Sequence, residues 1–226
     1  MLKPKSQRSA IRSRLNRGLS GVKLLALFAF LTLTFPQAAL ACDPNGIGQA
    51  APNTRKAGLN ILKNRRAQPI VFRDVSVAEM LAYPNNDDAN LEASDAVVLR
   101  GQLLDAHHEK AESPNCGAKH DYHVWIAAID AAHPNGIRLT KAQRAYRKKH
   151  SVVVELTPNI QDMHPVWGAK LKRQLAGKNV CITGWLLFDY EHPPQIGKTR
   201  ATLWEVHPIT GIAVLQPDGS CAPWIP

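Results

Sequence analysis

Residues 151–189, SVVVELTPNIQDMHPVWGAKLKRQLAGKNVCITGWLLFD, contain the pattern from which we infer the architecture. The β-branched run Ser151–Thr157 predicts a strand that stops at Pro158. Over Pro165–Leu175 apolar residues recur at helical spacing, and Val180–Asp189 again has the composition of a strand. This stretch therefore predicts one helix between two strands.

Three further segments have strand-like composition: Ala96–Ala106, His123–Asp130 and Arg200–His207, the last with a continuation over Ile212–Leu215 after Pro208. Three strands, one helix and two strands is the order of the OB-fold, a five-stranded Greek-key barrel. Gly101 suits the bend that the first strand of such a barrel needs. We expect a mainly β chain with a five-stranded OB-like Greek-key barrel and a helix between strands 3 and 4. The lone helix disfavours the alternative, a small β-sandwich.

The first 41 residues resemble a signal peptide. They contain seven Lys and Arg and no acid, followed by an apolar run, Leu24–Phe35, which is too short for an ordinary membrane-spanning helix. Ala39–Ala41 offers a small-x-small cleavage site. We therefore expect a mature chain that begins at Cys42 and is periplasmic or secreted, with no transmembrane segment. Lipid attachment at Cys42 is the less favoured alternative, because Ala39 stands where lipid attachment usually requires Leu.

We expect three parts after this leader: an N-terminal arm with a short helix and a linker (42–95), the barrel domain (96–215) and a C-terminal tail (216–226). In the arm, residues 43–58 are polar and rich in helix breakers, which predicts a loose segment. Ser76–Glu79 form a capping-box pattern that predicts a short helix, and residues 84–95 resemble a linker. Inside the barrel domain, Pro134–Gly136 predict a turn, and Thr140 is positioned to cap a short basic helix.

Most of the positive charge of the chain belongs to the leader. Of 28 Lys and Arg, seven lie in the first 41 residues, which leaves 21 against 18 Asp and Glu, a formal net charge of +3. One basic segment remains, uninterrupted by any acid: Arg138, Lys141, Arg144, Arg147, Lys148, Lys149 and His150. Such a segment could concentrate an anionic partner at the surface, and the alternative is a solvated helix face.

Four cysteines follow the leader: Cys42, Cys116, Cys181 and Cys221. An even number in an oxidising compartment predicts two disulfides, with three possible pairings. A pairing of Cys42 with Cys221 is attractive because both lie near the ends of the mature chain. The sequence has no C-x-x-C spacing, which argues against a cysteine metal site.

Several motifs resemble those of a group of uncharacterised, exported bacterial OB-like proteins with a terminal W-E-[IV]-H-P motif. Residues 175–189 (LAGKNVCITGWLLFD), Glu191-His192 and residues 200–208 (RATLWEVHP) carry the resemblance. Asp121–His123 and Glu155–Pro158 match the D-x-H and E-x-T-P motifs of the group. The resemblance implies the OB-like fold and adds little about function.

In an OB-fold, two loops flank the usual binding face, and here they should be His107–His120 and Tyr190–Thr199. Trp125, Trp185 and Trp204 lie on three different strands, where they could stack on the bases of a single-stranded nucleic acid or pack into the core. The candidate ligand-binding residues are Trp185, His192, Lys198, Arg200 and Trp204.

Acidic and histidine residues suggest a metal site as an alternative. Asp121 with His123, and Glu205 with His207, should share one face of a strand. Glu155 lies in an apolar strand and needs a partner, which Arg200, His123 or His207 could supply. A structural network is the simpler interpretation, and zinc or manganese would suit these donors. The candidate metal ligands are Asp121, His123, Asp189, His192, Glu205 and His207.

The sequence thus predicts an exported OB-fold binding module for a polyanion, a polysaccharide or a protein partner at the barrel rim, with no cofactor. The alternative is a divalent-metal-dependent hydrolase, phosphodiesterase-like, that uses the Asp/His/Glu set. The chain contains no recognisable serine-nucleophile motif, phosphate-binding glycine loop or dinucleotide fingerprint.

Overall fold

The computed structural model describes residues 46–86, 95–117 and 119–226. The predicted leader, Cys42 and most of the predicted linker lie outside the described residues. Within the described part, no helix has the length and apolar character needed to cross a bilayer.

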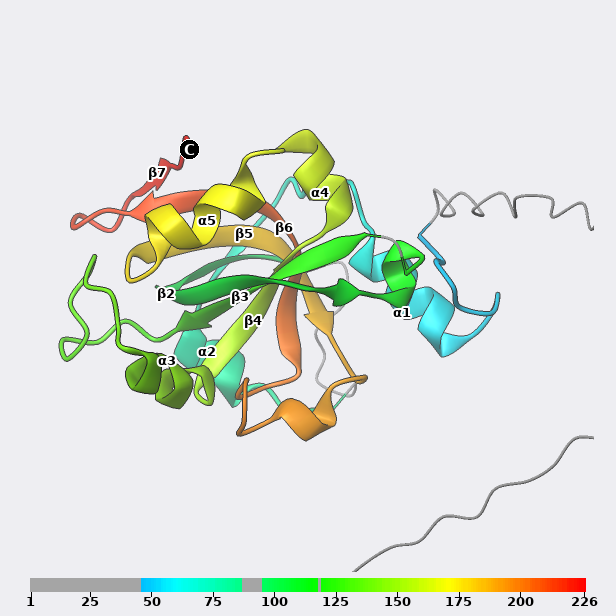
Figure 1. Ribbon diagram of the computed structural model, residues 1–226, viewed down its shortest axis with the longest axis horizontal. Helices are drawn as coiled ribbons and strands as arrows, with labels where there is room; N and C mark the ends of the chain where they lie inside the picture. The colour runs from blue at the N-terminus through cyan, green and yellow to red at the C-terminus, as the bar shows by residue number, and fades with distance from the viewer. Residues whose placement is uncertain (1–45, 87–94, 118) are drawn as a thin grey trace, which may run out of the picture. The chain divides into compact units, whose positions relative to one another are not determined.

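Strands dominate the described chain (Figure 1). They are β1 (Arg73–Ser76), β2 (Ala96–Ala111), β3 (His120–Ala127), β4 (Ser151–Leu156), β5 (Asn179–Phe188), β6 (Trp204–Leu215) and β7 (Cys221–Pro223). Five of them close a barrel in the order β2-β3-β4-β6-β5, and β5 pairs again with β2. The β4–β6 pair is parallel and the other barrel pairs are antiparallel. The predicted fold class, a five-stranded barrel with a helix between its third and fourth strands, is confirmed.

The described helices are α1 (Arg55–Lys63), α2 (Val77–Ala82), α3 (Lys141–Lys148), α4 (Pro158–Met163) and α5 (Trp167–Leu175), with single 3-10 turns η1 (Ser113–Asn115) and η2 (Pro193–Gln195). Both predicted capping boxes are present, at Ser76 before α2 and at Thr140 before α3. The prediction of a loose segment over residues 43–58 is wrong for the last residues of that range, because α1 begins at Arg55. Thr54 accepts a hydrogen bond from the Ala57 backbone and caps this helix.

The predicted bounds of three strands need correction. The second strand spans His120–Ala127 rather than His123–Asp130, and the last begins at Trp204 rather than Arg200. The first strand continues to Ala111 rather than ending at Ala106, because His107 and His108 pair with His123 and Tyr122 of β3. His107 and His108 therefore lie on a strand and not in a loop. The last strand runs through Pro208 without a break. Its pairing with β5 is irregular around Gly184, which is where a residue without an N–H is tolerated.

Gly101 lies where β2 changes its partner. Residues 96–102 of β2 pair with β5, and residues 102–111 pair with β3. A Cβ atom at Gly101 would stand 2.4 Å from Ile126 Cγ2 and 2.7 Å from the Ala127 carbonyl oxygen. The strand can curl between its two partners because no side chain separates it from β3 at this point.

Two apolar clusters lie on opposite faces of the barrel wall. The main core contains Val124 and Val154, together with Leu171 and Leu175 of α5. Trp125 and Val153 belong to a second cluster. Neighbouring strand residues point to opposite faces, so the second cluster lies on the outer face, where α3 packs against β2, β3 and β4.

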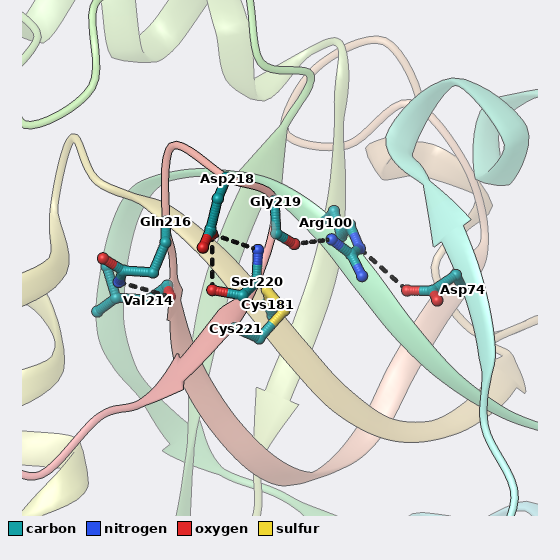
Figure 2. Close-up of a disulfide and its surroundings, with 9 residues drawn as sticks. All are labelled: Asp74, Arg100, Cys181, Val214, Gln216, Asp218, Gly219, Ser220 and Cys221. Carbon is teal, nitrogen blue, oxygen red and sulfur yellow. Dashed lines mark hydrogen bonds and ion pairs between the residues drawn. A yellow bond between two sulfur atoms is a disulfide. The ribbon is translucent and has the colours of Figure 1, made fainter.

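A disulfide joins Cys181 of β5 to Cys221 of β7 (Figure 2). The predicted pairing of Cys42 with Cys221 is therefore wrong. The physical reason is that β7 folds back on β6, next to β5, and brings Cys221 to the buried Cys181. Arg100 strengthens this corner of the barrel, because its side chain contacts Asp74 Oδ1 (3.0 Å) and the Gly219 carbonyl oxygen (2.6 Å). Cys116 is also disulfide-bonded.

Candidate functional site

The polar residues predicted to share strand faces converge on the outer face of the barrel wall. His123 of β3 pairs in register with Glu155 of β4. Their neighbours Val124 and Val154 point into the core, so His123 and Glu155 point outward. The same alternation places Glu205 and His207 of β6 on this face, on either side of the buried Val206.

Glu155 lies at the centre of the resulting network. Its Oε1 atom is 2.8 Å from His123 Nε2, and its Oε2 atom is 3.2 Å from His207 Nδ1. His207 Nδ1 is also 3.3 Å from Glu205 Oε2. Arg200 forms an ion pair with Glu205 and not with Glu155. Of the three partners predicted for Glu155, the two histidines are therefore in direct contact with it.

Asp189 forms a second part of the network at the end of β5. Its Oδ2 atom is 2.5 Å from His192 Nδ1, 3.4 Å from Lys63 Nζ and 3.9 Å from Arg200 Nη1. Lys63 is only 2% exposed. Sequence reasoning missed Lys63, because it precedes Asp189 by 126 residues and lies on the helix that was not predicted.

Burial and neighbouring charges shift the pKa values of this network in different directions. Burial and the nearby Glu155 charge raise the pKa of Asp121 to about 7. Burial alone would lower the pKa of His123, but Glu155 beside it raises that pKa to about 9. Burial opposes ionisation of Asp189, yet the hydrogen bond from His192 and the charge of Lys63 lower its pKa. Charged partners therefore stabilise the ionised groups of the network. Asp121 is the carboxyl group of the network whose ionised form is least favoured.

The loop that contains Thr199, Arg200 and Ala201 covers much of this outer face of the barrel wall. The Thr199 carbonyl oxygen accepts a hydrogen bond from Trp125 Nε1 (2.7 Å), and the Ala201 N–H donates to Ser151 O (2.9 Å). Arg200, which lies between them, is fully buried. The predicted rim is thus occupied by ion pairs within the chain.

The candidate ligand-binding residues have different exposures. Trp204 is buried and donates a hydrogen bond to the Pro84 carbonyl oxygen (2.7 Å). Trp185 donates to the Ala67 carbonyl oxygen (2.9 Å), and the Arg65 guanidinium lies over its ring. Trp204 is therefore not available for stacking, and Arg65 already stacks on the ring of the partly exposed Trp185. Lys198 is exposed and His192 is partly exposed.

Two groups of side chains could hold a metal ion among the described residues. They are Asp121, Glu155 and His207, and Asp189, His192 and Glu205; within each group, one ligand atom per residue lies within 4.8 Å of the others. Of the six predicted ligands, His123 falls in neither group. The second group already contacts Lys63 and Arg200, whose charges oppose a cation there.

A basic pocket lies on another part of the barrel surface. It has a volume of about 170 Å³ and is lined by Leu104, Asp105, Arg138, Leu139, Arg144, Lys172, Ala176 and Gly177. Leu104 and Leu139, which belong to the outer apolar cluster, give it an apolar lining. The carboxylate of Asp105 is 2.8 Å from Lys172 Nζ and 3.0 Å from Lys148 Nζ.

Two residues of the predicted basic segment, Arg138 and Arg144, line this pocket. Arg147 turns inward, is buried, and binds Gln102 and the Ala128 carbonyl oxygen, which attaches α3 to the barrel. The remaining basic residues of the segment are exposed or partly exposed. Lys172 was not predicted to belong here, because it comes from α5 and meets the segment only in the folded chain.

Comparison with known proteins identifies no relative. No known protein-family model matches the chain, and no curated protein sequence matches it significantly.

Proposed function

We propose that this chain is an exported OB-like binding module whose basic pocket holds one anionic group of an acidic polysaccharide. The observation that carries the proposal is the composition of the pocket. Arg138, Arg144 and Lys172 line it, and its one lining acid, Asp105, is already paired with two lysines. The pocket therefore keeps a positive charge that an anionic group would neutralise.

Both arginines are held in place at the pocket. Arg138 Nη2 donates to the Arg173 carbonyl oxygen and Arg144 Nη1 donates to the Leu139 carbonyl oxygen, each at 2.5 Å. A guanidinium has five N–H donors in a rigid plane, so one bond to the backbone orients the others. Such fixed donors favour sulfate, phosphate or carboxylate groups, which accept paired hydrogen bonds.

A polymeric ligand is favoured because cations continue beyond the pocket. The helices α3 and α5 and the turns that flank them carry exposed basic side chains outside the pocket lining, namely Lys141, Lys149, Arg173 and Lys178. The disulfide of the barrel and the leader-like first 41 residues support an extracytoplasmic location. Polysaccharides are more abundant there than free nucleic acid, which supports a carbohydrate rather than a nucleic-acid ligand.

The buried network supports hydrolysis less well. A metal-dependent hydrolase must bring its substrate to the metal, but Asp121, Glu155 and His207 are each only 1% exposed. The pocket, by contrast, is open to solvent at exposed arginine and lysine side chains. The geometry therefore favours binding at the pocket over catalysis at the network.

A titration tests this proposal. The full chain is titrated with heparin fragments, single-stranded DNA and neutral dextran, at about 0.05 M and about 0.3 M salt. We expect heparin fragments to bind most tightly, with the logarithm of the affinity falling by about 2–3 per decade of salt, as for three to four charge contacts. Equal binding of dextran, or no binding of heparin at low salt, would refute the proposal. Tighter binding of single-stranded DNA than of heparin fragments would show that the ligand is a nucleic acid.

A further inference from the structure

Several buried polar atoms of the network have no hydrogen-bond partner, including His123 Nε2 and two Arg200 nitrogens, and three others belong to one group of neighbouring residues. These three are Asp121 Oδ1, Glu155 Oε2 and His207 Nε2, and each side chain is 1% exposed. Glu155 Oε2 lies at ion-pair distance from His207 Nδ1 (3.2 Å) but is not aligned for a hydrogen bond. Buried polar atoms are almost always satisfied by a partner, so these three atoms on neighbouring residues are available to bind a ligand.

The charges around these atoms favour a cation. The buried cations of the network contact the other two acids: Lys63 pairs with Asp189, and Arg200 pairs with Glu205. Among the described ion pairs, Glu155 contacts only histidines, and Asp121 has none. Lys63 influences Glu155 only from beyond ion-pair distance. Asp121 and Glu155 are thus two buried carboxylates that form no ion pair with a lysine or arginine among the described residues.

We propose that Asp121, Glu155 and His207 bind one divalent transition-metal ion, Zn²⁺ or Mn²⁺. One ligand atom from each residue lies within 4.8 Å of the others, so small side-chain rotations would bring all three donors to about 2.0–2.2 Å from a shared ion. One imidazole nitrogen and two carboxylate oxygens are donors that zinc and manganese accept. The proposed metal site does not depend on the function proposed for the basic pocket.

The residues around the site would orient its ligands. His207 Nδ1 faces Glu205 Oε2 at 3.3 Å, and Arg200 holds Glu205 in turn. A carboxylate on one ring nitrogen is the usual partner of a histidine whose other nitrogen binds a metal. Asn115 donates to Asp121 Oδ2 (2.9 Å), which leaves Oδ1 for the ion. Binding would displace any proton from His207 Nε2.

The position of the site suggests a structural role. The parallel β4–β6 pair is registered at a single position, Val154 with Val206. Glu155 directly follows Val154, and His207 directly follows Val206. An ion held by both would therefore join the two strands beside the barrel's shortest pairing. The metal would therefore stabilise this junction of the closed barrel, and it would not contact a substrate.

Metal titration of the chelator-treated full chain tests this site. We expect one equivalent of Zn²⁺ or Mn²⁺ to bind and to raise the thermal unfolding midpoint. Asp121→Asn should weaken metal binding by at least about 10–100-fold. Without metal, this variant should be as stable as the metal-free wild type, because an amide can still accept the Asn115 hydrogen bond. The matched control is Asp162→Asn, an exposed acid paired with Lys119, which should bind like the wild type. Failure of the wild type to bind one equivalent, or unchanged binding by Asp121→Asn, would overturn the proposal.

A second measurement needs no variant. Zinc added to the wild type should shift the imidazole NMR signals of His207. The stacked rings of His108 and His120 provide an internal control for adventitious binding. Shifts confined to those two histidines would overturn the proposal.

Discussion

Lys172 Nζ lies 2.8 Å from Asp105 Oδ1, so the last turn of α5 is joined to β2 at the basic pocket. Lys148 of α3 contacts the other oxygen of the same carboxylate at 3.0 Å. Burial opposes ionisation of Asp105, but the hydrogen bonds from Lys172 and Lys148 lower its pKa. One carboxylate therefore fixes two helices to the barrel and leaves the pocket positive.

Replacing the Asp105 carboxylate separates its effect on ligand binding from its effect on the stability of the fold. Asp105→Asn should tighten the binding of heparin fragments several-fold, because it removes the acid of an otherwise basic pocket. It should lower the free energy of unfolding by about 1–2 kcal/mol, because two partly exposed ion pairs are lost. Polymer titration and urea unfolding of the same preparation measure both effects. Weaker binding by a folded Asp105→Asn protein would contradict the assignment of the pocket.

The close approach of β5 to β6 gives a stability prediction. A Cβ atom at Gly184 would lie 2.4 Å from the Pro208 carbonyl oxygen and 2.6 Å from Val206 Cγ1. Gly184→Val should therefore destabilise the fold by about 2–4 kcal/mol through overpacking. The control is Gly58→Ala on α1, where nothing lies within 4 Å of the new methyl group, and where we expect about 0.5–1 kcal/mol of stabilisation. Urea unfolding measures both, and a Gly184→Val protein of wild-type stability would refute the close approach.

The ion pair between Asp189 and His192 predicts a pH dependence. The hydrogen bond with Asp189 raises the pKa of His192, while Glu205 and Arg200 act on it in opposite directions. The stabilisation from protonated His192 is thus complete below its unfolded pKa of about 6.5 and is lost as the pH rises through the higher folded pKa. His192→Gln should cost about 1–2 kcal/mol at low pH and much less at high pH.

Urea unfolding of the wild type and His192→Gln at about pH 5.5 and about pH 9 measures this difference. Titrating groups that do not interact with His192 contribute equally to both proteins, so they cancel in the comparison. A stability difference that is the same at both pH values would contradict the pairing.

The sequence predicted the architecture well, because local patterns carry it. Strand composition, the interruption at Gly101 and the capping boxes at Ser76 and Thr140 all act within a few residues. Alternation along single strands also predicted that Asp121 shares a face with His123 and Glu205 with His207, but it left three possible partners for Glu155. These features depend on the types and the spacing of residues within short segments of the sequence.

Features formed by distant segments were not predictable in the same way. Lys63 reaches Asp189 only after α1 packs on the barrel, and Lys172 meets Asp105 only when α5 folds back to β2. Cys181 and Cys221 pair because of a final hairpin, which turns at Pro217–Gly219 within the segment that was predicted only as a C-terminal tail. Trp185 resembled a stacking residue, but the segment that covers it, around Ala67, lies 118 residues away.

The direct test of the proposed function compares two double variants in heparin binding at about 0.05 M salt. Arg138→Gln with Arg144→Gln removes two charges from the pocket, and Lys110→Gln with Lys198→Gln removes two exposed charges outside it. We predict that the pocket variant loses at least about tenfold in affinity and that its salt dependence becomes shallower by about 1.5, while the other variant binds like the wild type. Equal losses in both, or a greater loss in the lysine variant, would show that the pocket is not the binding site.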